Sequence, residues 1–418
     1  MLVGLVVLAV LGPLAFVAVR QFTGAGGATI NVFWWGGQAR ADLTHKALEL
    51  YSSRNPHVRF VERWQGDSGY FDELAALAAA GSAPDLFQID DNWLAEYLSR
   101  GVTMDLSPYI GSTIDTSGFS KGLAGSGTVN GRVGGVAAAG NTPAMIYDRT
   151  VVQRYGLVEP SAGMTWDELI AWGVELNQAS GGKVAGTMDP SADYQALQVW
   201  LRQQNKDLYD GARLGFTQAD LTRWFQMWAD ARTAGATPPP DVVRSANAGD
   251  ITKQLVATKA AGTSFVWSNQ LEELSAYTDH ELGIAPYPGD PVGQWARASM
   301  YWAASADTEH AGIVADVINF LVNDPGAGVI LGAERGLSPN LKVRERIADT
   351  LSPAMRTSVT FEARLSSRFG TTPPPPPAGH LQVKTQLTQA AESVQFARAT
   401  PEAAAKTFFA QVTQIMYG

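Results

Sequence analysis

Polar and aromatic side chains follow several strand-like runs of this sequence, at the positions where each run ends. Asp90 and Asp91 come directly after the short apolar run Leu86–Ile89, and a helical pattern begins at Trp93. In open α/β sheets, ligands bind in the loops outside the carboxyl ends of the strands. Carboxylates in such loops accept hydrogen bonds, and an indole offers a flat apolar face with one donor. The pattern therefore predicts a cleft that binds a small polar molecule.

The same residues give little sign of catalysis. Asp90 and Asp91 are adjacent, so they cannot face each other across a glycosidic bond at the separation of about 5–10 Å that a glycoside hydrolase uses. The five histidines show no metal-binding spacing, and Gly125-Ser126-Gly127 lacks the spacing of a nucleophile elbow. We expect no catalytic residue, metal or cofactor. The alternative is a secreted glycoside hydrolase or other glycan-active enzyme, because distant carboxylate pairs among forty acidic residues stay open.

Composition narrows the class of protein. The chain has 418 residues, a net charge of −9 and no long basic run, so we expect two domains and no nucleic-acid partner. Cysteine is absent, which excludes disulfides, thiolate metal sites and a cysteine nucleophile. Twelve tryptophans could supply stacking faces, although core packing is the expected role of at least half of them.

Residues 1–27 form a separate N-terminal segment. Residues 2–19 are an apolar run interrupted only by Gly4, Gly12 and Pro13, which suits a signal-peptide core or one membrane span. A spacer rich in glycine follows. We expect the chain to be exported to the periplasm or to the extracytoplasmic face of the cell membrane, with this segment either cleaved or retained as a tether.

From Ala28 onward, strand patterns and helical patterns alternate. Ala28–Trp35, residues 58–64 and Leu86–Ile89 read as strands, and a helical pattern follows each of them. Strands that alternate with helices in this way predict a parallel, doubly wound sheet.

Shorter motifs predict turns, caps and one extended segment. Asn130-Gly131 between valines predicts a two-residue hairpin. Thr165 and Glu168 have the spacing of a capping box at the start of a helix. Residues 371–377 (TTPPPPP) must be extended polyproline II. We interpret this run as a stiff spacer, with a docking ligand for a partner protein as the less favoured alternative.

Taken together, these motifs resemble those of a known family in their order and spacing. They are Trp34-Trp35-Gly36-Gly37, residues 81–90 (GSAPDLFQID), residues 141–148 (NTPAMIYD), Gly156-Leu157, residues 165–169 (TWDEL), Phe265-Val266-Trp267, Tyr301-Trp302-Ala303 and residues 336–339 (GLSP). They cover nearly all of the chain from Ala28. The chain resembles the family-1 extracellular solute-binding proteins of ABC importers, of the maltodextrin-binding type. Many exported relatives carry a lipidated cysteine after the signal segment, which this chain lacks.

The resemblance implies an α/β fold, the two-lobed periplasmic-binding-protein fold of type II. Each lobe would hold a mostly parallel sheet flanked by helices, and three hinge crossings would let the lobes close over a ligand. The crossings would fall near residues 141–144, 298–300 and 334–336. Lobe 1 would then comprise residues 28–142 and 299–335, and lobe 2 residues 143–298 and 336–418.

The resemblance also implies which residues face the cleft between the lobes. They are Trp35, Gly37, Gln38, Tyr70, Asp90, Asp91, Asn141, Trp200, Trp267, Ser268, Asn269, Tyr301, Trp302, Gly336, Arg364 and Arg368. Asp91 is preferred as the ligand-facing carboxylate, with Asp90 as a helix cap. Of the four aromatic platforms (Trp200, Trp267, Tyr301, Trp302), about two should touch the ligand. Tyr70 could instead be core filler, and the two arginines could be solvated.

The function implied is that of the substrate-binding component of an ABC importer. The protein would capture a carbohydrate or sugar derivative by hinge closure, as a monomer, and deliver it to permease subunits in the membrane. A neutral oligosaccharide, an amino sugar and a glycerophosphodiester all stay open as ligands. An unpaired carboxylate in the cleft would favour the amino sugar, and a cleft arginine would favour the phosphodiester.

Overall fold

The computed structural model describes residues 27–417, so the predicted N-terminal signal or anchor segment, except Gly27, lies outside the described residues. Within this range, no single helix is long and apolar enough to cross a membrane. Helices α10 (Ala311–Asn323) and α11 (Pro325–Leu331) meet the length and composition criteria only as a pair, and they are bent by 67° relative to each other.

The first lobe is built on a five-stranded sheet with the order β2-β1-β3-β12-β6. Strands β1 (Ala28–Trp35), β2 (Val58–Gln65) and β3 (Leu86–Ile89) are parallel, as the sequence predicts. Strand β12 (Arg297–Ala304) pairs antiparallel with both β3 and β6 (Val136–Asn141). All four residues of β3 are buried, which is typical of a central strand covered on both faces. The polar residues that follow β3 are therefore held at the middle of the sheet edge.

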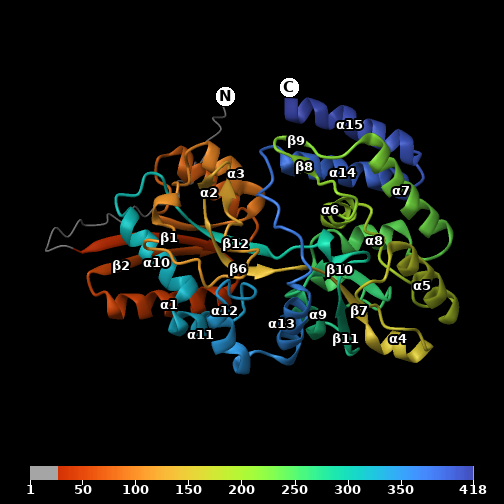
Figure 1. Cartoon of the computed structure of the whole chain (residues 1–418), viewed down its shortest axis with the longest axis horizontal. Helices are drawn as coiled ribbons and strands as arrows, with labels where there is room; N and C mark the ends of the chain where they lie inside the picture. The colour runs from red at the N-terminus through yellow and green to blue at the C-terminus, as the bar shows by residue number, and fades with distance from the viewer. Residues whose placement is uncertain (1–26, 418) are drawn as a thin grey trace, which may run out of the picture.

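Helices cover both faces of this sheet and enclose one hydrophobic core. Ile30, Phe33, Leu86 and Trp302 belong to that core and are at most 1% exposed. Figure 1 shows this lobe as the half of the molecule that holds the red and orange segments, with β6 pointing toward the second lobe. The helices of this half are α1 (Gln38–Arg54), α2 (Tyr70–Ala79), α3 (Asp91–Ser99), α10 and α11, and α12 (Leu341–Ile347) packs against α11.

The second lobe holds a three-stranded sheet with the order β10-β7-β11. Both β10 (Thr263–Trp267) and β11 (Leu282–Ala285) run antiparallel to β7 (Pro143–Asp148), so the predicted mostly parallel sheet is wrong for this lobe. The reason lies in the connections. The chain leaves the sheet at the Asp148 end of β7, and β10 and β11 both begin at that same end. Their carboxyl ends consequently point toward the first lobe.

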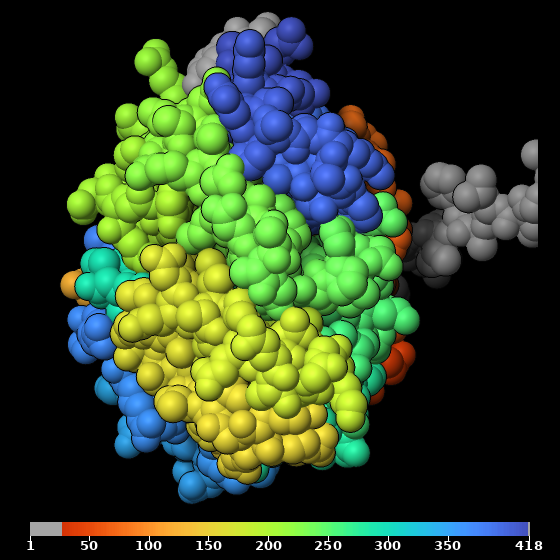
Figure 2. Space-filling view, turned by 90° about the vertical axis from the view of Figure 1, so that its right-hand side faces the viewer, coloured from red at the N-terminus to blue at the C-terminus, as the bar shows by residue number. Residues whose placement is uncertain are grey.

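A larger helical layer surrounds this second sheet and has a hydrophobic core of its own, separate from that of the first lobe. The C-terminal helices α14 and α15 pack against each other and against α7, and they form the upper part of the outer face in Figure 2. The helices of this half are α4 (Arg149–Tyr155), α5 (Trp166–Ala179), α6 (Tyr194–Arg202), α7 (Gln218–Thr233), α8 (Pro240–Ala246), α9 (Gln270–Ala276), α13 (Pro353–Leu365), α14 (His380–Gln395) and α15 (Pro401–Tyr417).

Local motifs behave as their residues predict. Strands β4 (Thr128–Val129) and β5 (Arg132–Val133) form a hairpin in which Asn130 and Gly131 have φ of 50° and 79°, as a type I′ turn requires. Thr165 and Glu168 form the predicted capping box at the start of α5. A second small hairpin, β8 (Tyr209–Asp210) with β9 (Arg213–Leu214), follows α6.

The chain passes between the lobes most directly at Thr142, which separates β6 from β7. The segment 286–296 leads back from β11 to β12. Gly140 exchanges backbone hydrogen bonds with Leu337, of 2.7 and 2.9 Å, so the stretch after Gly336 lies beside β6. After this stretch, the chain joins the second lobe at α13, which packs against α9 and β11. The number of crossings and the residue bounds of the lobes stay predictions.

Candidate functional site

A cavity of about 710 Å³, counted to its open mouth, lies between the two lobes. Lobe 1 and the returning segment contribute Asp91, Trp295, Arg297 and Tyr301, and lobe 2 contributes Tyr194, Gln195, Gln198, Asp207, Leu208, Tyr209, Gly211 and Trp267. Residues 372–377, which connect α13 to α14, complete the wall.

An ion network stands at the lobe 1 side of the cavity. The Arg297 guanidinium donates from Nε to Asp91 Oδ2 at 2.7 Å and from a terminal nitrogen to the other Asp91 oxygen. The same nitrogen reaches Asp90 Oδ2 at 3.2 Å. Arg297 also lies over the Trp267 ring, 4.6 Å from its centroid. One guanidinium thus serves two carboxylates and one indole face.

Backbone structure holds each member of this network in place. Asp90 is the N-cap of α3, because its Oδ1 accepts a hydrogen bond of 2.9 Å from the amide of Asn92. Asp91 is the first residue of the helix, and Arg297 is the first residue of β12, opposite Asn141 in β6. The predicted cap role of Asp90 is confirmed. The end of a buried central strand therefore presents both carboxylates to the start of β12.

The two carboxylates differ in their electrostatics. Burial and the neighbouring Asp91 raise the pKa of Asp90 to about 6. Burial would also raise the pKa of Asp91, but the Arg297 guanidinium outweighs it, and the pKa of Asp91 is lowered. Asp91 is thus the firmly ionised partner of Arg297, whereas Asp90 gains a proton in mildly acidic solution.

Aromatic side chains form much of the remaining wall. Tyr301 donates its hydroxyl to the Ser126 carbonyl at 3.1 Å, and the Tyr209 hydroxyl pairs with His380 Nδ1 at 2.7 Å. Burial raises the pKa of Tyr194, Tyr209 and Tyr301, so each keeps its hydroxyl proton at neutral pH. Burial also lowers the pKa of His380 to about 4, so its ring is neutral there. The cavity offers flat faces and neutral hydroxyls beside one ion network.

Three of the residues implied by the resemblance line this cavity directly. They are Asp91, Trp267 and Tyr301, and Asp90 stands behind them in the ion network. Trp267 arrives there at the end of β10, and Tyr301 arrives from the middle of β12. Two of the four proposed aromatic platforms therefore reach the cavity.

The other two aromatic platforms do not. Trp302 is 1% exposed and packs beneath the Arg335 guanidinium, 5.4 Å from its ring centroid. Adjacent strand residues point to opposite faces, so Trp302 enters the core because Tyr301 faces the cavity. Trp200 lies in lobe 2 against Trp224 and under Arg223. The structure corrects both predictions.

Tyr70 and the end of β1 also differ from the prediction. Tyr70 is fully buried, and its hydroxyl donates to the carbonyl of Gln88 at 2.8 Å, so it fastens α2 to β3. Trp35 packs on that tyrosine, with ring centroids 5.1 Å apart. Gly37 and Gln38 are exposed at the start of α1, and Gln38 bonds to Asp42 of its own helix. None of these four residues lines the cavity.

The polar groups of residues near the crossings are bonded within the protein instead of lying open at the cavity. Ser268 is 1% exposed and donates its hydroxyl to Glu362 at 2.8 Å. Asn141, 5% exposed, donates to Asn269 Oδ1 at 3.2 Å. The Gly336 amide donates to the Ala333 carbonyl at 2.9 Å. The φ of Gly336 is +113°, a backbone conformation that favours glycine. None of these predicted ligand contacts lines the cavity.

The two predicted rim arginines lie elsewhere. Arg364 and Arg368 are exposed on α13 and just beyond it, and they line a separate groove of lobe 2 together with Arg149 and Arg356. The helix axis carries them away from the proline run that follows. The cavity arginines are Arg297 and, behind the wall, Arg202.

Sequence reasoning missed several cavity residues. Arg297 directly precedes a strand-like run, and Tyr194 and Tyr209 lie next to short helical and hairpin segments that carry no motif. Trp295, which lies beneath the Arg202 guanidinium at 5.2 Å, belongs to no motif of the sequence. The available signal was a lone arginine at a predicted crossing, close to a predicted pair of carboxylates.

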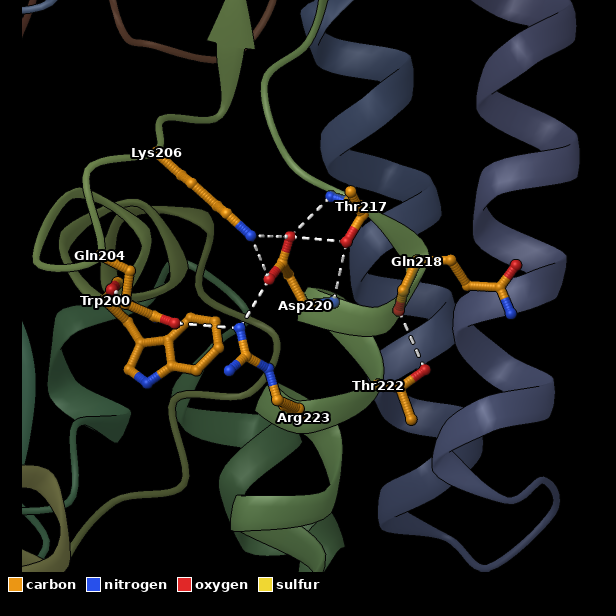
Figure 3. A network of polar contacts seen from close by, with 8 residues as sticks. All are labelled: Trp200, Gln204, Lys206, Thr217, Gln218, Asp220, Thr222 and Arg223. Atoms are coloured by element: carbon orange, nitrogen blue, oxygen red, sulfur yellow. Dashed lines mark hydrogen bonds and ion pairs between the residues drawn. The ribbon is translucent and has the colours of Figure 1, made fainter.

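Figure 3 shows a second ion network, in lobe 2, which is centred on one buried carboxylate and whose residues do not line the cavity. Asp220 is 2% exposed and accepts from Lys206 at 2.6 and 2.7 Å and from Arg223 at 2.7 Å. Thr217 adds its amide and its hydroxyl, at 2.8 and 2.7 Å. This network includes Trp200 through Arg223 and fixes the start of α7.

Among residues 27–417, no group of three or more histidine, aspartate or glutamate side chains gathers in a way that could hold a metal ion. The titratable groups at the cavity are instead paired with arginines, Asp91 with Arg297 and Asp207 with Arg202 at 2.6 Å. The arrangement suits hydrogen bonding and ring stacking.

Comparisons with known proteins place this architecture among binding proteins. A family model described as bacterial extracellular solute-binding protein matches residues 46–350. A family-1 extracellular solute-binding protein from Alicyclobacillus acidocaldarius is similar in structure, with a TM-score of 0.77, 23% identity, and coverage of 94% of this chain and 100% of that chain.

Two further solved structures are similar over the same extent. A periplasmic oligogalacturonide binding protein from Yersinia enterocolitica has a TM-score of 0.78 and 21% identity, covering 93% of this chain and 99% of that one. The sugar-binding protein MalE from Xanthomonas citri has a TM-score of 0.77 and 16% identity, covering 93% and 97%. At these identities the similarity shows the fold, which confirms the predicted two-lobed architecture.

Proposed function

The chain belongs to the bacterial extracellular solute-binding proteins, and on that premise we propose that it captures a carbohydrate or sugar derivative between its lobes and delivers it to an ABC permease. Binding of a solute is the role of the family. The carbohydrate, the hinge closure and the permease partner are the parts that we infer. The sugar-binding neighbours support the ligand class, because they share the fold over nearly the whole chain.

The observation that carries the proposal is the composition of the cavity wall. Trp267, Tyr301 and Trp295 present aromatic faces beside the Asp91–Arg297 pair. A pyranose ring has an apolar face that stacks on such side chains and an edge of hydroxyls that can both donate and accept hydrogen bonds. Asp91 accepts, Arg297 donates, and the protonated tyrosines do both. The wall thus matches both faces of a sugar.

Capture would follow from movement of the lobes about their connections. In the open form, the lobe 1 residues Asp91 and Tyr301 separate from Tyr194 and Trp267 of lobe 2. Closure brings both sets onto one ligand and excludes water, as in hinge-closing binding proteins. The closed surface, which includes parts of both lobes, is then the form that a permease recognises. We expect the protein to act as a monomer at the extracytoplasmic side of the membrane.

The charges at the cavity favour a neutral sugar or an amino sugar over a glycerophosphodiester. Arg297 is already bound by two carboxylates, and Arg202 by Asp207. The predicted rim arginines lie in a separate groove. An incoming phosphate would have to displace a carboxylate from its guanidinium, whereas an ammonium group or hydroxyl would meet acceptors.

A hydrolytic role has less support. The carboxylates that line the cavity, Asp91 and Asp207, are each held by an arginine, and the pKa of Asp91 is lowered, whereas a general acid needs a raised pKa. Asp90 has the raised pKa but serves as a helix cap behind the wall. We therefore propose binding without chemistry.

The test is a thermal-shift screen of the purified protein against neutral sugars, amino sugars, uronic acids and glycerophosphodiesters. A ligand at a hundred times its dissociation constant stabilises the folded state by about 2.7 kcal/mol, which raises the transition by about 2–4 °C or less in a chain of this size. We expect a rise with one sugar class, with the compound recovered unchanged. The variant Trp267→Ala should lose that rise, and the control Trp200→Phe should keep it.

A rise only with glycerophosphodiesters would contradict the carbohydrate proposal. Consumption of a glycan during the incubation, measured by chromatography, would instead favour the hydrolase.

A further inference from the structure

The proline run is part of the cavity and not an external spacer. We call residues 371–377 the proline strap. Residues 372–377 line the cavity, and Pro375 is buried although it belongs to a surface connection between two helices. Figure 1 shows the connection from α13 to α14 passing along the junction of the two lobes. A stiff spacer would have no reason to lie there.

Polar contacts fasten the strap where it enters the junction. The Gly370 amide donates to the Gln294 carbonyl at 3.0 Å, and the Thr372 hydroxyl donates to the Ala296 carbonyl at 2.9 Å. Both acceptors belong to the segment that returns to lobe 1. The Thr371 carbonyl accepts 2.6 Å from a terminal nitrogen of Arg202. The strap is therefore bound to lobe 2 and to the returning segment together.

Arg202 is the residue that positions this end of the strap. Its other two nitrogens donate to the Gly293 carbonyl at 3.1 Å and to Asp207 at 2.6 Å. Its guanidinium also covers the Trp295 ring. One buried arginine thus links α6, the hairpin loop at Asp207, the cavity tryptophan and the strap.

The far end of the strap is fixed at the start of α14. The His380 amide donates to the Pro377 carbonyl at 3.1 Å, and its ring pairs with the Tyr209 hydroxyl at 2.7 Å. Tyr209 itself lines the cavity. Between these two anchored ends, the chain consists of five consecutive prolines.

Five prolines give this wall an unusual chemistry. Each ring fixes φ, so the segment stays extended without hydrogen bonds of its own and loses little conformational entropy when it is held. No proline carries an N–H group, so the wall offers carbonyl acceptors and apolar ring faces but no backbone donor. Such a surface suits the C–H faces and hydroxyl hydrogens of a sugar, and it cannot withdraw as a flexible loop would.

We propose that the proline strap is a fixed wall that limits the length of the ligand, so that the cavity accepts a monosaccharide or disaccharide and excludes longer chains. The inference rests on the proposed carbohydrate function and adds the size of the substrate and the segment that sets it. The strap runs along the lobe junction, so a longer chain that extended past it would have to displace Pro375 and the anchors on both sides.

The first test makes the strap flexible. In the triple variant P374G/P375S/P376G the anchors remain, but the segment can move outward. We measure affinities by calorimetry for the glucose and N-acetylglucosamine series from monomer to tetramer. We expect the variant to gain about tenfold in affinity for the trimer and tetramer relative to the dimer. The matched control is P239G, in the other proline run, which should keep the wild-type preference. An unchanged length preference in a folded, binding triple variant overturns the proposal.

The second test needs no ligand. The chain has no cysteine, so Pro375→Cys introduces a single thiol in the buried part of the strap, and Ala378→Cys introduces one at an exposed position beyond it. We expect maleimide to label the thiol at position 375 at least about tenfold more slowly than the thiol at 378, with further protection by a bound sugar. Equal rates without ligand overturn the seating of the strap.

The two tests separate the strap from the carbohydrate function. If a sugar raises the transition temperature but the thiols at positions 375 and 378 label at equal rates, the wall is rejected and the carbohydrate function is retained. Slow labelling with no binding of any saccharide rejects the carbohydrate function, and length selection is rejected with it.

Discussion

Two ion networks of this protein, one in lobe 2 and one at the cavity, use similar groups in different surroundings. In lobe 2, Asp220 receives two cations, a hydroxyl and an amide, so positive charge and donors exceed what one carboxylate needs. At the cavity, one guanidinium serves two carboxylates, Asp90 and Asp91. The first network is saturated, and the second has an excess of acceptors.

The pKa shifts of the carboxylates differ between the two networks in the same sense. Burial would raise the pKa of Asp220, but hydrogen bonds from Lys206 and Thr217 outweigh it, and the pKa is lowered. The pKa of Asp90 is raised to about 6 by burial and by Asp91. A saturated network stabilises the fold, whereas unused acceptors at the edge of a cavity can receive a ligand's donors. The difference suggests that charge balance distinguishes structural from binding networks better than burial does.

The largest expected effect is on stability, in lobe 2. Asp220→Ala removes the N3 half of the capping box of α7 and the acceptor of Lys206, Arg223 and Thr217, so the free energy of unfolding should fall by about 2–4 kcal/mol. Urea unfolding measures this, and Asp230→Ala, at an exposed position of the same helix, is the control. Sugar affinity of the folded fraction should not change. A loss below about 1 kcal/mol would mean that the network is not structural.

Next comes an effect on binding. Arg297→Ala removes the guanidinium that joins the two carboxylates and covers the Trp267 ring, so affinity for the sugar found in the screen should fall about a hundredfold. Calorimetry measures the change. Arg364→Ala, in the separate groove, should leave affinity within twofold of wild type. If the Arg364 variant weakened binding as much, the cavity would not be the ligand site.

A fall in pH should change the stability contributions of Asp90 and Asp220 in opposite directions. The raised folded pKa of Asp90 means that the folded state holds this proton more tightly, so its ionisation destabilises the fold at pH 7. The penalty is relieved as pH falls through about 6 toward 4. Asp220, whose pKa is lowered, contributes stability above its ordinary pKa that is lost only at lower pH.

The variant Asp90→Asn keeps the helix cap and cannot ionise. Its free energy of unfolding should therefore rise less than that of wild type between pH 7 and pH 5, by on the order of 1 kcal/mol. Asp193, whose pKa is also raised to about 6, titrates in both proteins and cancels in the difference. Identical pH profiles for the variant and wild type would show that Asp90 does not carry the excess charge.

The smallest expected effect concerns Trp200, which the sequence resemblance placed in the cleft. Trp200→Phe keeps an aromatic face for Arg223, so we expect no measurable change in sugar affinity and a stability loss within about 1 kcal/mol. Trp267→Phe, the matched change in the cavity, should weaken binding severalfold. Fluorescence titration with the sugar compares the two.

Much of the fold was predictable because local patterns and family motifs agree with it. The parallel strands β1 to β3, the Asn130-Gly131 hairpin and the cap at Asp90 follow from periodicity, turn geometry and capping preferences. The antiparallel second sheet was not predictable, because strand direction depends on the end at which a long helical connection returns to the sheet.

The site was only partly predictable. The predicted site residues Asp91, Trp267 and Tyr301 line the cavity because strand ends converge there in this fold. Trp302 was misplaced because the alternation of a strand does not say which face is core when both neighbours are aromatic. Arg297 and the proline strap were missed because their partners are distant in the sequence.

The amino-acid sequence by itself determined the class of this protein: alternating strands and helices, polar and aromatic strand ends, no cysteine and an excess of acidic residues. These properties are local or additive, and they need no knowledge of distant contacts. Only the tertiary structure decided that Arg297 balances Asp90 and Asp91, that Asp220 is saturated, and that five prolines close the cavity. Each of those facts depends on segments that are brought together by packing of the two lobes.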